Sequence, residues 1–355
     1  MTETTQDMDH GKLDEFLGRF VGDLAATGSA GGVVIGSRLG LYRALARGAA
    51  TAEHFAERTG CDRRYLTEWL RGQAAAGYIT YDPATAEFSL TPEQEFCLAD
   101  PNGPDLPAAC RIVLGYLRAE PRITEAFRTG EGVGWHEHDD DVFVGCDAFY
   151  RPGYVADLVP TWIPALDGVV EKLTSGARIA DVGCGLGSSS VLLGQAFPQS
   201  TVVGSDYHAE SIELARKKAA EAGVADRVTF EVGTAQTFAG TGYELVTTFD
   251  CLHDMGDPPG AARRIREALA PDGTWLLVEP NAADTVEGTL NPVGRLYYNG
   301  SLFLCLPNAL SQQGGYALGA QAGEAAVREI AAEAGFTRFR RAAETPFNLV
   351  YEIRP

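Results

Sequence analysis

The sequence predicts a doubly wound α/β domain that follows a helical unit of winged-helix type. Three observations predict this fold: a glycine-rich turn that closes an apolar segment at 177–187, alternating strands and helices from about residue 176 onward, and a helix–helix–helix–hairpin pattern within residues 1–100. A chain of 355 residues is long enough for about two domains with a sizeable core. We therefore expect a winged-helix or dimerisation domain at 1–100, a helical connector with a lid loop at 101–175, and a ligand-binding catalytic domain at 176–355.

The alternating pattern of the catalytic domain predicts the residue ranges of its strands and helices. Strands are predicted at 177–182, 201–205, 227–232, 244–249 and 274–278, with two final strands near 337–343 and 347–353. Helices are predicted at 188–197, 209–222, 259–270 and 324–334, and an insertion is predicted at 281–320. Parallel strands with helices on both faces bind ligands at the carboxyl ends of the strands.

The turn after the first of these strands, ADVGCGLG at 180–187, is the most informative segment. A strand, a tight glycine turn and a helix N-terminus form an arrangement in which backbone N–H groups approach a nucleotide-like ligand. The glycines supply positive φ and leave space that a Cβ would fill. Such a turn alone also suits NAD, FAD or plain tight packing. The candidate cofactor-binding residues of this turn are Asp181, Gly183, Cys184, Gly185 and Gly187.

An acidic residue at the end of the next strand narrows the choice of ligand. Asp206 follows Gly187 by nineteen residues and is placed to accept hydrogen bonds from ribose hydroxyls. Because the other strand ends meet at the same edge of the sheet, residues there belong to the same predicted site. These further cofactor-binding candidates are Tyr207, Thr234, Ala235, Phe249 and Asp250.

The fourth strand places a histidine next to this site. His253 comes just beyond the strand, and a histidine has a pKa suited to removing a proton from a hydroxyl group. Glu279 ends the next strand, so it would lie beside His253, orient the imidazole and stabilise its charged form. The alternative is that His253 buttresses the following helix, with Asp254 as the polar residue that leads into it. We predict a catalytic group of His253, Glu279 and Asp254.

The winged-helix unit is predicted from helices near 39–45, at 52–58 and at 63–76, followed by a hairpin with strands at 78–81 and 87–90. A DNA-binding unit presents a basic face. Residues 1–100 instead hold nine Lys and Arg against fifteen Asp and Glu, and Asp62 and Glu68 offset the arginines of the helix at 63–76. This charge favours dimerisation or shaping of the substrate pocket over DNA binding.

The connector and the insertion hold the candidates for contact with an acceptor. The loop at 130–141 contains His136 and His138 with three aspartates, but it lacks zinc-finger or H-E-x-x-H spacing, so we predict no metal ion. A charged solvated loop and a lid that reaches the active site are two further interpretations. The candidate acceptor contacts are Trp135, His136, Arg151, Tyr154, Trp162, Arg295, Tyr298 and Phe303. Interdomain packing, an inserted helical pair or a dimer contact would explain the same residues.

The composition excludes several classes of protein. The net charge of −19 argues against a polyanion such as nucleic acid as the main partner. No apolar run reaches the ~20 residues that a membrane span needs, and the polar, acidic stretch at 1–10 is not a signal peptide. Seven scattered cysteines without a C-x-x-C pair indicate reduced thiols. We therefore expect a cytoplasmic protein that does not act on membranes.

These motifs together resemble a known family. The D-x-G-x-G-x-G turn, LHD after the fourth strand and VEP after the fifth, behind a winged-helix N-terminus, resemble the O-methyltransferases of the plant caffeate and acetylserotonin type. These are Rossmann-like class I methyltransferases that use S-adenosyl-L-methionine. The resemblance implies that His253 is the general base and that Glu279 assists it. It also implies a homodimer, to which a helix at 13–24 would contribute.

The likeness to one bacterial group spans nearly the whole chain. The strings FDCLHDMGDP, RPGY, WHEHD, LNPVGR and TPFNLVYE resemble bacterial two-domain methyltransferases that include mycobacterial members. Three positions depart from the patterns: Met255 replaces the family tryptophan after HD, Leu186 stands where a histidine is common, and Thr234-Ala235 stands where many enzymes have an acidic residue for adenine. Cofactor binding follows from the resemblance, whereas the identity of the acceptor does not.

The sequence thus predicts a methyltransferase that acts on a small, partly apolar molecule through an oxygen atom. Aromatic and aliphatic residues in the insertion at 281–320 suit such an acceptor. N-, S- or C-methylation is a chemical variant, because proximity alone promotes transfer to a good nucleophile. The same motifs would also suit a winged-helix regulator that senses the cofactor, or a member of the fold that does not methylate.

Overall fold

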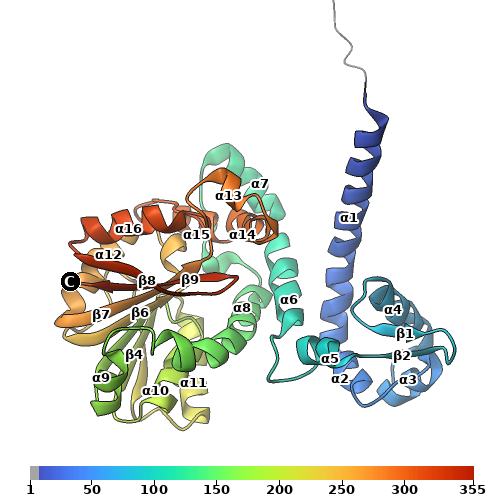
Figure 1. Cartoon of the computed structure of the whole chain (residues 1–355), viewed down its shortest axis with the longest axis horizontal. Coiled ribbons are helices and arrows are strands. Elements are labelled where there is room, and N and C mark those ends of the chain that lie inside the picture. Colours follow the sequence, from blue (N-terminus) through green and yellow to red (C-terminus); the bar gives the residue numbers. More distant parts are fainter. Residues whose placement is uncertain (1–7) are drawn as a thin grey trace, which may run out of the picture. The chain divides into compact units, whose positions relative to one another are not determined.

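The computed structural model describes residues 8–355, and contacts divide the chain into two compact units that join between Leu114 and Gly115 (Figure 1). Each unit has a hydrophobic core of its own.

The first unit has the predicted winged-helix pattern. Its elements are α1 (His10–Arg38), α2 (Leu41–Leu45), α3 (Ala52–Thr59), α4 (Arg63–Ala75), β1 (Thr80–Asp82), β2 (Glu87–Ser89) and α5 (Pro92–Leu98), and α6 (Leu106–Leu117) leads out of it. The side chain of Thr51 caps α3 and that of Asp62 caps α4, as expected for these residue types. Leu41, Phe55 and Leu70 are buried in the core of this unit.

Helix α1 is longer than the predicted helix at 13–24. Glycines at 28, 31, 32 and 36 have low helix propensity, so the sequence did not predict that the helix continues through them. Packing requires one of them, because a Cβ on Gly36 would lie 2.5 Å from Cζ2 of Trp69 and 2.8 Å from Cε2 of Tyr42. The indole N–H of Trp69 donates to the carbonyl of Gly32 at 2.8 Å. Tertiary contacts with α4 therefore outweigh the propensity of this segment.

Two arginines of α4 are paired with carboxylates. Arg63 lies 3.2 Å from Glu53, and Arg64 pairs with Glu68. Asp62, which the sequence suggested both as a cap and as an offsetting charge, is the N-cap of the helix. Exposed pairs of this kind contribute little to stability, but they reduce the positive charge that α4 presents.

The second unit is built on a seven-stranded sheet with the order β5-β4-β3-β6-β7-β9-β8. Its strands are β3 (Arg178–Val182), β4 (Thr201–Asp206), β5 (Val228–Val232), β6 (Tyr243–Phe249), β7 (Leu269–Pro280), β8 (Arg338–Glu344) and β9 (Asn348–Arg354). Strands β3 to β7 are parallel, and β9 runs antiparallel to β7 and β8. The predicted doubly wound sheet with a final hairpin is confirmed.

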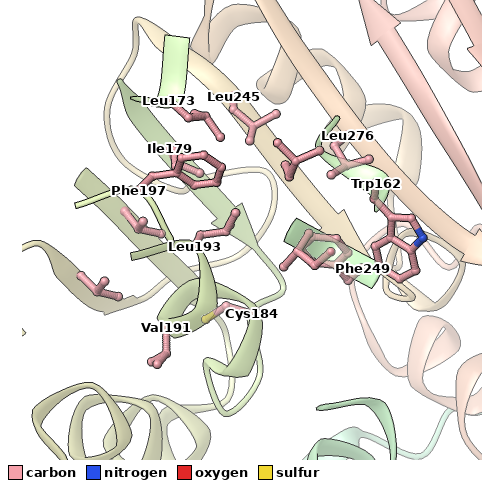
Figure 2. Packing of buried hydrophobic residues seen from close by; sticks show 14 of the residues in the cluster. Trp162, Leu173, Ile179, Cys184, Val191, Leu193, Phe197, Leu245, Phe249 and Leu276 are labelled. Carbon is pink, nitrogen blue, oxygen red and sulfur yellow. The ribbon is translucent and has the colours of Figure 1, made fainter. Parts of the chain in front are cut away.

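Helices cover both faces of this sheet. One face carries a π-helical segment (Tyr154–Trp162), α9 (Val169–Ser175), α10 (Ser188–Ala196) and α11 (Ala209–Glu221), and the other carries α12 (Pro258–Ala268) and α16 (Gly323–Glu333). Helix α8 (Asp140–Gly153) leads into the π-helical segment. Successive strand residues alternate between the two cores: Ile179 and Leu245 belong to the first, Ala180 and Val246 to the second. Figure 2 shows the first core, in which Trp162 lies beside Phe249.

The order of the strands creates a crevice at the carboxyl edge of the sheet. Strand β3 has β4 as its neighbour on one side and β6 as its neighbour on the other, so the order of the strands reverses at β3. This is a topological switch point, the place where open α/β sheets bind ligands. The residues that end β3, β4, β5 and β6 therefore face one site.

Five further helical segments of this unit lie outside the sheet layers. The long connection after β7 contains α13 (Val286–Thr289), α14 (Pro292–Phe303) and α15 (Cys305–Ser311), while α7 (Glu120–Thr129) and a short 3-10 helix (Trp135–Glu137) precede α8. The predicted loop at 130–141 is thus ordered at its centre. The helix after it runs on into the π-helical segment beyond Pro152, a proline that cannot donate a helical hydrogen bond.

Candidate active site

A cavity of about 220 Å³ lies at the carboxyl edge of the sheet, within the second unit. Its wall comes from the ends of four parallel strands, the segment after β6, the 3-10 helix at 135–137, α8 and α15. The predicted site residues that line it are Trp135, Tyr154, Gly183, Cys184, Gly185, Asp206, Tyr207, Thr234, Ala235, Phe249, Asp250, His253 and Asp254. The structure therefore brings together residues that are far apart in the sequence.

The glycine turn after β3 offers space to a ligand. Gly185 has φ of 51°, and nothing lies within 4 Å of the position where a Cβ would project. The N–H of Gly185 donates to Oδ2 of Asp206 at 2.9 Å, and those of Gly183 and Cys184 donate to the carbonyl of Ser205. The expectation that these N–H groups would face the ligand is therefore wrong, because the neighbouring strand already binds them.

Two predicted residues of this turn have structural contacts instead of a place in the cavity wall. A Cβ on Gly187 would lie 2.6 Å from Cζ of Phe230, so packing requires the glycine. Asp181 is buried, and its carboxylate accepts hydrogen bonds from Ser189 and Ser190 at 2.6 Å and from Thr247 at 2.8 Å. Asp181 thus ties the start of α10 to β3 and β6.

Asp206 ends β4 and faces the cavity. Its two carboxylate oxygens accept the N–H groups of Gly185 and His208, each at 2.9 Å. Each oxygen keeps a further lone pair for a ligand hydroxyl. Burial raises the pKa of Asp206, while these two backbone hydrogen bonds lower it. Thr234 and Ala235, at the end of β5, line the cavity as well.

His253 and Glu279 form a buried pair at the same edge. His253 lies on a 3-10 turn after β6 (Leu252–Asp254), and its Nδ1 atom is 2.6 Å from Oε2 of Glu279. The second carboxylate oxygen of Glu279 accepts the N–H of Leu252 at 3.1 Å. Glu279 itself does not line the cavity, so it acts on the site through the imidazole.

The protonation of His253 is set by opposing effects. Burial lowers the pKa of His253, but the Glu279 carboxylate and a hydrogen bond with the Cys305 thiol together raise it well above its usual value. Burial raises the pKa of Asp254 to about 7, with the imidazole lowering it and Glu279 raising it further. Proton positions in this cluster are therefore linked.

Asp250, which follows β6, has a backbone conformation that is rare outside glycine. Its φ is 48°. Its N–H donates to the carbonyl of Val278 at 2.8 Å, and its Oδ1 accepts from the amide of Asn348 at 2.8 Å. Burial, and then the charge of Glu279, raise the pKa of Asp250 to about 8.

Helix α15 contributes residues that sequence reasoning missed. Asn308 accepts the N–H of Trp135 at 3.1 Å and the hydroxyl of Tyr207 at 2.8 Å, and it donates to the carbonyl of Asp254 at 3.1 Å. Gln312 donates to that same carbonyl at 3.1 Å. The sequence pattern could not predict the role of Asn308, because only the fold brings this amide into contact with three segments of the cavity wall.

The aromatic acceptor candidates divide into cavity residues and residues behind the wall. Trp135 and Tyr154 line the cavity. Trp162 does not; it is buried beneath Phe249, with ring centroids 6.2 Å apart (Figure 2). Tyr150, which was not predicted, lines the cavity from α8.

Five other acceptor candidates have no place in the cavity wall. His136, Arg151, Arg295 and Tyr298 are exposed at the surface. Phe303 instead stacks on Tyr116, with ring centroids 5.1 Å apart. The sequence pattern did not show which side of these helices would face the ligand.

The described residues hold neither a membrane span nor a cluster of metal ligands. Between residues 8 and 355, no helix has both the length and the apolar character to span a membrane. Over the same stretch, no three His, Cys, Asp or Glu side chains gather closely enough to hold a metal ion.

The glycine turn, the end of β4 and the segment after β6 share one cavity. Gly185, Asp206 and His253 all line it.

Two stretches of the chain match known domain families. Residues 173–323 match a methyltransferase domain, and residues 28–100 match the Rv2258c-like winged HTH domain. The chain thus joins a winged HTH domain to a methyltransferase domain, which confirms the predicted fold. A methyltransferase domain uses S-adenosylmethionine, so the predicted cofactor is also confirmed.

Individual relatives share this domain. Methyltransferase GfsG of Streptomyces halstedii is 26% identical over 146 residues, covering 41% of this chain and 51% of the relative. Demethylmenaquinone methyltransferase of Lactiplantibacillus plantarum is 29% identical over 129 residues, covering 36% and 54%. The chain thus spans about half the length of these curated relatives.

A solved structure shows the same fold over nearly the whole chain. Mitomycin 7-O-methyltransferase MmcR superposes with a TM-score of 0.70 and 22% sequence identity. The match covers 97% of this chain and 98% of that one.

Proposed function

We propose that the protein transfers a methyl group from S-adenosylmethionine to a hydroxyl group of a small, partly apolar molecule. One observation carries this proposal: the His253 imidazole, held by Glu279 at 2.6 Å, lines the same cavity as the glycine turn and Asp206. When bound, S-adenosylmethionine supplies an electrophilic methyl group.

The donor half of the cavity is formed by strand ends. Gly183 and Gly185 leave room for the cofactor, and Asp206 would accept hydrogen bonds from its ribose hydroxyls. Thr234 and Ala235 would border its base. These assignments follow from the position of each residue at the carboxyl edge of the sheet.

The acceptor half contains the base. Because Nδ1 of His253 is engaged by Glu279, Nε2 is the atom that would take the proton from the acceptor hydroxyl. Glu279 would then stabilise the resulting imidazolium. Tyr154, Phe249 and Leu304 give this half an apolar wall, which suits a partly apolar acceptor.

Product release tests this function directly, and a variant at Glu279 tests the role of the base. Purified protein given S-adenosylmethionine and a panel of hydroxylated aromatic compounds is expected to release S-adenosylhomocysteine only with an acceptor, as measured by liquid chromatography. Because Glu279 raises the pKa of His253, neutral imidazole forms only as the pH rises through that raised pKa, and kcat should rise with it. In Glu279→Gln this rising limb should move to lower pH, and the maximal kcat should fall about tenfold or more.

The control for this experiment is Glu333→Gln, a change at an exposed glutamate at the end of α16. Its pH profile should match that of the wild type. Identical profiles for Glu279→Gln and the wild type would contradict the proposed base. Tight binding of the cofactor with no release of product from any acceptor would instead favour a cofactor-sensing regulator.

We also propose that the protein is a homodimer in which α1 takes part. Phe16, Phe20 and Leu24 are exposed and repeat at a spacing of four residues, so they share one face of this helix. An exposed apolar strip of this kind favours association. Light scattering is expected to give the mass of two chains for the wild type and of one chain for Phe20→Glu. A wild-type mass of one chain would contradict the dimer.

A further inference from the structure

Apart from His253, the charged side chains that line the cavity are acidic. Among the described residues, Asp147, Asp206, Asp250 and Asp254 line it, and no lysine or arginine does. Asp147 is neutralised by Lys218, whose Nζ lies 2.7 Å from Oδ2 and 2.8 Å from Oδ1. Among the described residues that line the cavity, only His253 can carry a positive charge, and the Glu279 carboxylate already pairs with it at 2.6 Å.

Asp250 is the acidic residue with unused binding capacity. Its Oδ1 is held by Asn348, but Oδ2 is buried and has no hydrogen-bond partner among the described residues. A buried carboxylate oxygen without a partner is costly, and so is the left-handed backbone at φ of 48°. The sheet hydrogen bond to Val278 and the amide of Asn348 hold both features in place. Such a combination indicates a group prepared for a ligand.

Asp250 belongs to the acceptor half of the cavity. Asp250 lies three residues before His253 on the segment that follows β6, and both residues line the cavity. Asp206, by contrast, is held by the glycine turn and by the start of α11. Asp250 was predicted to bind the cofactor, but these neighbours favour contact with the acceptor.

Aromatic rings border the same region. Tyr150 on α8 and Tyr154 at the start of the π-helical segment both line the cavity, as Asp250 does. The ring centroids of Tyr154 and Phe249 are 5.3 Å apart. A carboxylate beside aromatic faces is the chemistry that recognises an organic ammonium group.

We propose that Asp250 binds a positively charged nitrogen on the acceptor, so that the enzyme prefers phenols bearing an ammonium group over phenols bearing a carboxylate. This inference rests on the proposed methyl transfer, because it names the class of acceptor for the same cavity. The charged nitrogen would donate to the Asp250 carboxylate, while the hydroxyl group to be methylated would face His253. Because burial raises the pKa of Asp250 to about 8, the bound ammonium group would also serve to keep this carboxylate ionised.

The test uses three probes with the same dihydroxyphenyl ring and the variant Asp250→Asn. Dopamine carries an ammonium group, 4-ethylcatechol is neutral, and 3,4-dihydroxyphenylacetate carries a carboxylate. Asparagine has the shape of aspartate, tolerates the left-handed backbone and removes only the charge. Asp226→Asn, at an exposed carboxylate in the loop before β5, is the matched control.

Binding is measured by calorimetry with the protein saturated by S-adenosylhomocysteine, so the readout does not depend on turnover. The wild type and the control should bind dopamine about tenfold more tightly than 4-ethylcatechol, and 3,4-dihydroxyphenylacetate most weakly. Asp250→Asn should lose about tenfold in affinity for dopamine and should keep its affinity for 4-ethylcatechol and for S-adenosylhomocysteine.

Three outcomes would overturn the inference. The first is a wild type that binds dopamine no more tightly than 4-ethylcatechol, or does not bind it at all. The second is a variant that keeps the preference for dopamine. The third is a variant that loses affinity for S-adenosylhomocysteine while the order of the probes stays the same, because Asp250 would then serve the cofactor. Binding with the expected preference but without methyl transfer would count against the proposed function alone.

Discussion

Replacing His253 with alanine is expected to lower kcat by about 10²- to 10⁴-fold while the affinity for S-adenosylhomocysteine stays the same. The loss follows because the imidazole would remove the proton of the acceptor, whereas Asp206 and the glycine turn that would hold the cofactor do not contact this side chain. Single-turnover kinetics and calorimetry measure the two quantities separately.

Removing the imidazole also leaves the buried Glu279 carboxylate without its partner, so His253→Ala is expected to unfold at a lower temperature. His253→Gln separates folding from catalysis, because its amide can still donate to Glu279 but cannot act as a base. His54→Ala, at an exposed histidine on α3, is the control for both variants. Full activity of His253→Gln would show that the acceptor needs no base at this position.

Replacing Asp206 with alanine is expected to weaken the binding of S-adenosylmethionine by about 10- to 100-fold. The variant loses the acceptor for the ribose hydroxyls and the two hydrogen bonds, at 2.9 Å, that hold Gly185 and His208. Calorimetry measures the affinity, and Asp226→Ala, at an exposed carboxylate, should bind like the wild type.

A second pair of ligands separates direct contact with the ribose from damage to the turn. Adenosine and 2′,3′-dideoxyadenosine differ only in the ribose hydroxyls. The wild type should prefer adenosine. Asp206→Ala should bind both nucleosides equally, because the interaction between the carboxylate and the ribose hydroxyls is then lost. A preference for adenosine that persists in the variant would place the ribose elsewhere.

Much of the donor site could be predicted from the sequence because its residues follow strands. In a parallel sheet the carboxyl ends of the strands meet, so Gly185, Asp206 and His253 had to approach one another once the strands were recognised. Glu279 could be placed beside His253 by the same reasoning, and the two side chains are 2.6 Å apart. The period and the order of the strands can be read from short stretches of sequence, and these two features are enough to place the residues at the strand ends.

The acceptor wall could not be predicted in the same way. Asn308 and Tyr150 reach the cavity only because α15 and α8 pack at the edge of the sheet, and helical periodicity does not tell which neighbour a polar face will meet. The same uncertainty led to the wrong placement of Arg151 and Tyr298, which are exposed. The full length of α1 was missed for a related reason, because glycines such as Gly36 are explained only by the side chains of another helix.

The contact between Gly183 and Cys251 has a consequence for how this protein can diversify. A Cβ at position 183 would lie 2.7 Å from the Cys251 sulfur, so the donor turn and the segment that carries His253 constrain each other's size. Evolution can hardly change one without the other. The acceptor wall on α15 and on the 3-10 helix at Trp135 lies outside the sheet layers. New acceptors can therefore be acquired by changing these segments, with the methyl-donor half left as it is.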